Sequence, residues 1–220
     1  MNRFINALLL FVFLPTLVIA IFVGFDLPIT FLRVSGKDLP YREEIFLGIG
    51  LLILMINMRR SIRRWMGLRI VNKQEKFKWN VAVSPSRKKR VLTYLLLEIA
   101  VFTFLGIGFY VVTPLAWMPA IGFLYAAVDN LVFAIVGGAN DRYRIGLSSK
   151  ALIAADRDVN VLYFTGLRKV TIHQQSIYFD YIKGLQLSFP IECIPETKLD
   201  EFLGELEGLI DRDKVFFSRS

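Results

Sequence analysis

The chain has 220 residues, of which 55% are hydrophobic, with a mean hydropathy of +0.49 and a net charge of +8. Such a high apolar content is unusual for a soluble domain and indicates a membrane protein. One cysteine, Cys193, excludes an internal disulfide framework, and a single histidine, His173, leaves no His and Cys cluster for a metal ion. We expect no cofactor.

Four apolar runs organise the first part of the chain, at residues 5–23, 45–58, 91–112 and 116–136. Three of them approach or exceed the roughly 20 residues that a helix needs to cross a bilayer. The run at 45–58 gives only about 21 Å of helix at 1.5 Å per residue. The first run begins like a signal peptide, but its apolar part is too long for one, so we expect an uncleaved anchor.

Charge predicts the orientation of these four spans. Segment 59–90 carries twelve Lys and Arg residues against one acid, Glu75. The positive-inside rule places this segment in the cytoplasm. Residues 24–44 then lie outside, and both termini lie inside, which requires the 45–58 run to span. We expect a multi-pass protein of a bacterial cytoplasmic (inner) membrane.

Segment 59–90 also predicts a surface contact. Ile62, Trp65, Met66 and Ile70 have helical spacing among arginines, which is typical of a helix lying in the headgroup layer. The charge favours anionic headgroups or a protein partner, or acts only as a topology determinant. No nucleic-acid-binding module accompanies it, so we expect no nucleic acid. The residues expected at the lipid surface are Arg59, Arg60, Arg63, Arg64, Trp65, Arg87, Lys88, Lys89 and Arg90.

Alternating patterns replace the long apolar runs after residue 138. Strands are predicted at 143–147, 159–164 and 170–172, followed by a hairpin at 177–189 that turns at Lys183-Gly184. One helical stripe then predicts a final helix, with its apolar positions at Leu199, Phe202, Leu203, Leu206, Leu209 and Ile210. The predicted fold is a four-helix transmembrane region at 1–138, followed at 139–220 by a small cytoplasmic α+β domain of antiparallel strands and a C-terminal helix.

The order of elements in this last third resembles the bacterial pleckstrin-homology-like domain that often follows transmembrane segments. The stretch YRIGLSSKALIAA resembles its opening hairpin, VLYFTGLRKVTI the strand and turn after it, and IYFDYIKGLQLSFP its later hairpin. The resemblance implies a binding or assembly module and carries over no catalytic residue. Arg168 and Lys169 are adjacent, but the domain has no concentrated basic pocket of the phosphoinositide type.

Two carboxylates lie inside the last two apolar runs. Glu98 and Asp129 fall about 11 and 14 Å from the cytoplasmic ends of these runs, so neighbouring antiparallel helices place them at similar depth. Neither should face lipid. They are either polar contacts, with at least one acid protonated, or a proton or cation site. As contacts, they share a proton, bond to Asn130 or Thr103, or meet Asn57 or a partner subunit. As contacts, they predict that Glu98→Gln and Asp129→Asn are mild.

The sequence contains no catalytic motif that we recognise. We expect a non-enzymatic membrane protein that presents a pleckstrin-homology-like module to a protein partner or to a second copy. The alternative is a small transport or channel subunit that uses Glu98 and Asp129.

Overall fold

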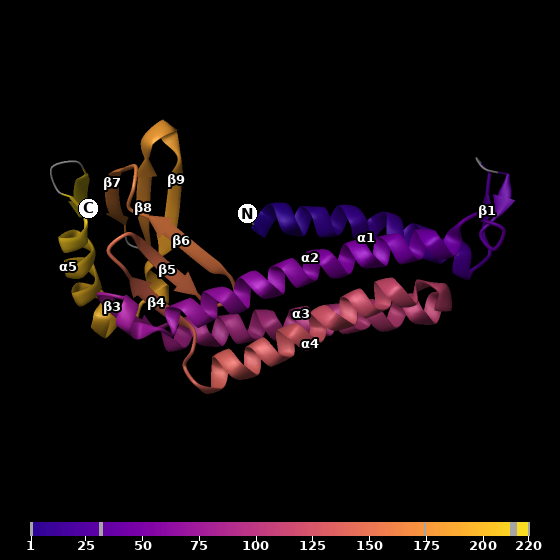
Figure 1. Ribbon diagram of the computed structural model, residues 1–220, viewed down its shortest axis with the longest axis horizontal. Helices are drawn as coiled ribbons and strands as arrows, with labels where there is room; N and C mark the ends of the chain where they lie inside the picture. The colour runs from indigo at the N-terminus through magenta and orange to yellow at the C-terminus, as the bar shows by residue number, and fades with distance from the viewer. Residues whose placement is uncertain (1, 31–32, 174, 212–214, 220) are drawn as a thin grey trace. The chain divides into compact units, whose positions relative to one another are not determined.

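The computed structural model describes residues 2–30, 33–173, 175–211 and 215–219 (Figure 1). The chain forms two compact units, and each unit is assembled from two separate stretches. The first unit is Met1–Ile62 with Leu95–Val132, and the second is Arg63–Tyr94 with Phe133–Ser220. Three long helices each have one part in the first unit and one part in the second.

The helices are α1 (Asn2–Gly24), α2 (Arg42–Val71), α3 (Pro85–Val112), α4 (Trp117–Ala139) and α5 (Leu199–Leu209). Three of the described helices are long and apolar enough to cross a membrane: α2, α3, and α4 with the turn that precedes it. The described side chains of α1 form a shorter apolar helix, Phe11–Gly24. Three of the four predicted spans therefore have the required length and composition here.

Aromatic side chains hold the core of the first unit together. Phe123 of α4 stacks on Phe109 of α3 with ring centroids 5.7 Å apart, and Phe13 of α1 meets both rings edge-on at about 6 Å. Edge-to-face and offset-stacked rings are the favoured geometries for such pairs. Gly50 of α2 lies against the backbone of Met118, where a Cβ would come within 2.6 Å. Contacts of these kinds bring all four helices into one bundle.

Helix α2 corrects one prediction made from the sequence. The 45–58 run and the expected headgroup helix after it form one continuous helix of 30 residues. The arginines beyond residue 58 favour helix as strongly as the apolar residues before them do, so nothing ends the helix there. Ile62, Met66 and Ile70 do share an exposed face, as predicted, while Trp65 is half-buried.

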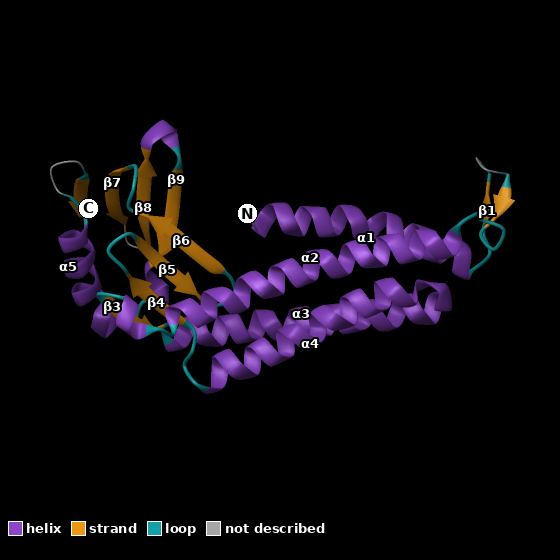
Figure 2. Cartoon of the chain, in the orientation of Figure 1, coloured by secondary structure: helices purple, strands orange, loops and turns teal. Residues whose placement is uncertain are grey.

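The strands of the second unit form two four-stranded sheets (Figure 2). The first has the order β3-β4-β5-β6 and is antiparallel throughout. Its strands are β3 (Trp79–Ala82), β4 (Arg144–Leu147), β5 (Ala151–Ala155) and β6 (Val159–Tyr163). The second has the order β10-β7-β8-β9, and its strands are β7 (Leu167–His173), β8 (Ser176–Tyr181), β9 (Gln186–Pro190) and β10 (Phe216–Arg219). The first unit contains one short hairpin, of β1 (Pro28–Ile29) and β2 (Val34–Ser35).

Strand β3 was not predicted, and it changes the division of the chain. It comes from the basic segment between α2 and α3 and pairs with β4, which follows α4. The compact unit that contains the sheets therefore includes Arg63–Tyr94, whereas the sequence placed a boundary at residue 138. Two strands that are hydrogen-bonded to each other cannot lie on opposite sides of a bilayer. The segment before α3 and the segment after α4 therefore lie on the same side of any membrane that the helices span.

The predicted hairpin at 177–189 is confirmed as β8 and β9, with Gly184 at φ +73° in the turn. The predicted stripe is confirmed in α5, where Phe202, Leu203 and Leu206 are buried. Phe202 contacts Trp79 of β3 and Phe189 of β9, with ring centroids 5.1 and 6.4 Å away. One aromatic side chain of α5 thus contacts both sheets.

The end of the domain differs from the prediction. The expected sheet is antiparallel and ends at the helix, but β10 follows α5 and pairs with β7 in parallel. A parallel partner needs a crossover connection, and α5 supplies it.

Candidate functional site

Glu98 of α3 lies in a polar cluster within the first unit. One of its carboxylate oxygens accepts hydrogen bonds from Arg60 of α2 at 2.7 Å and from Asn130 of α4 at 3.0 Å. The side chains of Arg60 and Glu98 are 14% and 17% exposed. The contact with Asn130 agrees with the sequence analysis, but the contact with Arg60 does not, because Arg60 was expected at the lipid surface.

Asp129, the second carboxylate, connects α4 with α2 from the position next to Asn130. It accepts a hydrogen bond from the hydroxyl of Ser61 of α2 at 2.8 Å. One turn earlier in α2, the side-chain amide of Asn57 donates to the main-chain oxygen of Gly122 at 3.2 Å. The cluster therefore connects α2 with α3 and α4 through hydrogen bonds at successive positions.

This geometry adds a basic partner that the sequence analysis did not expect. The guanidinium of Arg60 lies 2.7 Å from the carboxylate of Glu98. Charge-assisted bonds of this length are stronger than neutral ones. Arg60 was not predicted as a partner of Glu98 because it lies just beyond the 45–58 run. The signal that could have indicated it is that nothing in the sequence ends the helix at residue 58.

Two of the predicted lipid-surface arginines instead contact their own unit. The guanidinium of Arg64 lies over the ring of Phe133, 4.1 Å from its centroid, and Arg64 is only 2% exposed. A buried Arg64 cannot contact headgroups, so that prediction is wrong. Arg63 donates to the main-chain oxygen of Val159 at 3.2 Å, and Trp65 meets Phe133 edge-on at 5.2 Å. Arg59 is exposed.

The RKKR cluster at the start of α3 largely binds acids of the second unit. Arg87 donates to Asp156 at 2.7 Å, and Asp156 is buried. Lys88 pairs with Asp141 at 2.6 Å, and the hydrogen bond from Lys88 lowers the pKa of that carboxyl. Lys89 is exposed. These pairs fasten the first turn of α3 to the sheets, so much of the charge predicted to face lipid is neutralised within the protein.

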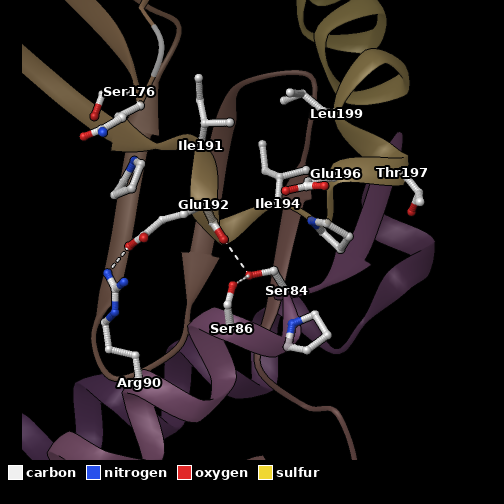
Figure 3. A pocket seen from close by; sticks show the side chains of 14 residues that line it. Ser84, Ser86, Arg90, Ser176, Ile191, Glu192, Ile194, Glu196, Thr197 and Leu199 are labelled. Carbon is white, nitrogen blue, oxygen red and sulfur yellow. Dashed lines mark hydrogen bonds and ion pairs between the residues drawn. The ribbon is translucent and has the colours of Figure 1, made fainter.

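Arg90, the last residue of the cluster, lines a cavity of about 1060 Å³ (Figure 3). It pairs with Glu192 at 2.5 Å, while the hydroxyl of Ser84 donates to the main-chain oxygen of Glu192. Glu196 and Thr197 contribute further polar groups from the turn that precedes α5. The cavity is lined by polar groups, by prolines and by the aliphatic side chains of Ile191, Ile194 and Leu199.

Cys193 and His173, the two residues whose side chains most often take part in catalysis, have ordinary structural positions. Cys193 is 3% exposed, and burial raises the pKa of its thiol to about 12. A thiol of that pKa is almost entirely protonated at neutral pH and is a poor nucleophile. His173 ends β7 and meets the ring of Tyr178 edge-on at 5.4 Å. Among the described residues, no group of three or more His, Cys, Asp and Glu is arranged to hold a metal ion.

Comparison of the chain with protein-family models, with curated proteins and with solved structures finds no match. The functional argument therefore rests on the contacts of these residues.

Proposed function

We propose that this chain is a non-enzymatic integral membrane protein that presents a pleckstrin-homology-like binding or assembly module at the cytoplasmic face. The observation that carries the proposal is the pairing of β3 with β4. Through this pairing, the basic segment between α2 and α3 and the part of the chain after α4 form one module. The module thus shares three helices with the bundle and is held at the membrane by them.

The order of elements supports the pleckstrin-homology-like part of this proposal. Four antiparallel strands, β3 to β6, are followed by the three strands β7 to β9 and then by α5, which contacts both sheets. The hairpin that the resemblance takes as its opening corresponds to β4 and β5, and β3 is a strand that precedes it. The additional strand β10 is a further feature in which this chain departs from that order.

Ion pairs support a structural use of the acidic residues. Glu98, Asp156 and Glu192 each pair with an arginine, at 2.7, 2.7 and 2.5 Å. Charge-assisted hydrogen bonds of this length fix both side chains in one geometry, as expected of a structural contact. The alternative, a transport or channel subunit using Glu98 and Asp129, is therefore less well supported by the contacts of Glu98.

The orientation belongs to the proposal as well. The twelve basic residues of segment 59–90 place the module in the cytoplasm, with both termini inside and α1 as the fourth span. We expect epitope tags at either end to be inaccessible from outside intact cells, and a tag inserted at Ser35 to be accessible. Permeabilised cells provide the control for tag exposure. A Ser35 tag on the same side as the C-terminal tag would contradict the proposal.

A further inference from the structure

A second, smaller cavity in the second unit differs from the first in its charge. It has a volume of about 400 Å³, near the lower end of the range for small-ligand sites. Its lining residues are Trp65, Leu68, Arg69, Asn72, Lys73 and Arg142. Three of these six carry a positive charge and none carries a negative one.

The three cations of this cavity lack the acidic partners that other basic residues have. Arg87, Lys88 and Arg90 each pair with a carboxylate. No carboxylate lies within ion-pairing distance of Arg69, Lys73 or Arg142 among the residues that the structure describes, and all three are exposed. Like charges brought together without an acid favour an anionic ligand.

Asn72 brings these cations to one place from two distant segments. Its side-chain amide donates to the main-chain oxygen of Leu68 at 2.7 Å and to that of Arg142 at 2.9 Å. The first bond lies within the end of α2, and the second ties the segment after α4 to that end. Arg142 therefore lines the same cavity as Arg69 and Lys73, although it follows them by about 70 residues in the chain.

The carbonyl groups at the C-terminal end of a helix carry partial negative charge, which would oppose an anion. At the end of α2, most of these carbonyl groups already accept hydrogen bonds. The oxygen of Leu68 accepts from Asn72, and that of Ile70 accepts from the main-chain N–H of Lys73. The oxygen of Val71 accepts from the side-chain amide of Asn80 at 2.8 Å. Three of the last four carbonyls of α2 are thus capped, and the cations remain available to a ligand.

We propose that this cavity binds a phosphate group, with Arg69, Lys73 and Arg142 as its ligands. Arginine binds phosphate oxygens through two parallel N–H donors, and lysine adds a point charge. Trp65 gives the cavity an amphipathic wall of the kind that is enriched where protein meets the headgroup layer. The phosphate belongs either to an anionic lipid headgroup or to a small soluble phosphate.

The test measures thermal unfolding of the full chain in a non-ionic detergent, where no charged membrane surface contributes. Phosphatidylglycerol, phosphatidylcholine and inorganic phosphate are titrated separately. A ligand that binds the folded state raises the midpoint in proportion to the logarithm of its concentration over its Kd. A rise with phosphatidylglycerol alone identifies a lipid headgroup, and an equal rise with inorganic phosphate identifies a soluble phosphate.

The pocket variant is Arg69→Gln, Lys73→Gln and Arg142→Gln together. The matched control is Lys76→Gln, Lys78→Gln and Lys150→Gln, which removes the same charge at exposed positions outside the cavity. At roughly a fivefold loss for each cation, we expect the pocket variant to bind about a hundredfold more weakly and the control to bind within about threefold of the unaltered chain.

Equal losses in the two triple variants would overturn the proposal, because the effect would then be one of net charge. The absence of any rise for the unaltered chain with both phosphatidylglycerol and inorganic phosphate would also overturn it. If the triple variant unfolds without ligand, Arg142→Gln and Lys78→Gln are compared as single changes, with a fivefold loss expected only for the first. The assay does not depend on which side of the membrane the module lies, so its failure leaves the proposed function standing.

Discussion

Replacing Glu98 by leucine should lower the unfolding midpoint of the protein in detergent by roughly 6–20 °C. The change leaves the guanidinium of Arg60, which is 14% exposed, without the carboxylate that lies 2.7 Å from it. Removing one partner of a largely buried ion pair typically costs about 3–5 kcal/mol, and about 1 kcal/mol corresponds to roughly 2–4 °C for a chain of this size. Asn130 also loses the acceptor of its side-chain amide.

Two further variants separate charge from hydrogen bonding. Glu98→Gln keeps an acceptor but removes the charge, so we now expect a substantial loss where the sequence alone predicted a mild effect. Asp129→Asn should remain mild, because an amide oxygen still accepts from the hydroxyl of Ser61. The double variant Arg60→Met with Glu98→Leu should recover most of the stability, since neither charge is then left alone.

Glu98→Gln with an unchanged midpoint would contradict this account of the pair. Flux measurements in reconstituted vesicles address the transport alternative with the same protein. If the unaltered chain conducts protons or cations and Glu98→Gln stops the flux without loss of stability, the cluster is an ion site and not a structural contact.

Gly67→Val should strongly destabilise the second unit. A Cβ at Gly67 would lie 2.0 Å from one methyl carbon of Val159 and 2.8 Å from the other, closer than atoms can approach. Val159 begins β6, and its main-chain oxygen also accepts from Arg63, so it has little freedom to move. Forcing a side chain into such a contact costs about 1–3 kcal/mol and occasionally more, or roughly 2–12 °C in the midpoint.

Gly204→Ala in α5 is the matched control, because a Cβ there meets no atom within 4 Å. Alanine is favoured over glycine in a helix by up to about 1 kcal/mol, so this variant should be stabilised. Both variants are compared by thermal unfolding in one detergent. A Gly67→Val protein as stable as the Gly204→Ala protein would show that α2 and β6 do not pack as described.

Local periodicity accounts for what the sequence predicted correctly. The β8–β9 hairpin has alternating apolar residues and a glycine at the turn, and α5 has a stripe with helical spacing, so each pattern lies within one short segment. The spans α3 and α4 are long apolar runs that need no distant contact to be recognised.

The missed features all depend on contacts between distant residues. Strand β3 alternates at Trp79 and Val81, but it lies among lysines and arginines, and its partner β4 is more than 60 residues away. The Arg60–Glu98 pair joins residues 38 apart in the chain. Strand β10 is four residues long and gains its order from β7, because so short a strand is not stable alone.

The most direct test of the proposed architecture is a disulfide between β3 and β4. Ala82 and Arg144 are paired in the antiparallel register, where opposite Cα atoms lie about 4.5–5.5 Å apart, within the range for a disulfide. Cysteines are introduced at both positions in a Cys193→Ala background, and the protein is oxidised in native membranes. A pair of Ala82→Cys with Lys150→Cys, in the turn that follows the far end of β4, is the control.

We predict that the 82–144 pair forms an intramolecular disulfide in most molecules, detected by mass spectrometry of the linked peptides, and that the 82–150 pair does not. Thiols at 82 and 144 that stay unlinked, and that react with a membrane-impermeant reagent from opposite faces of the membrane, would contradict a module built from both segments on one side.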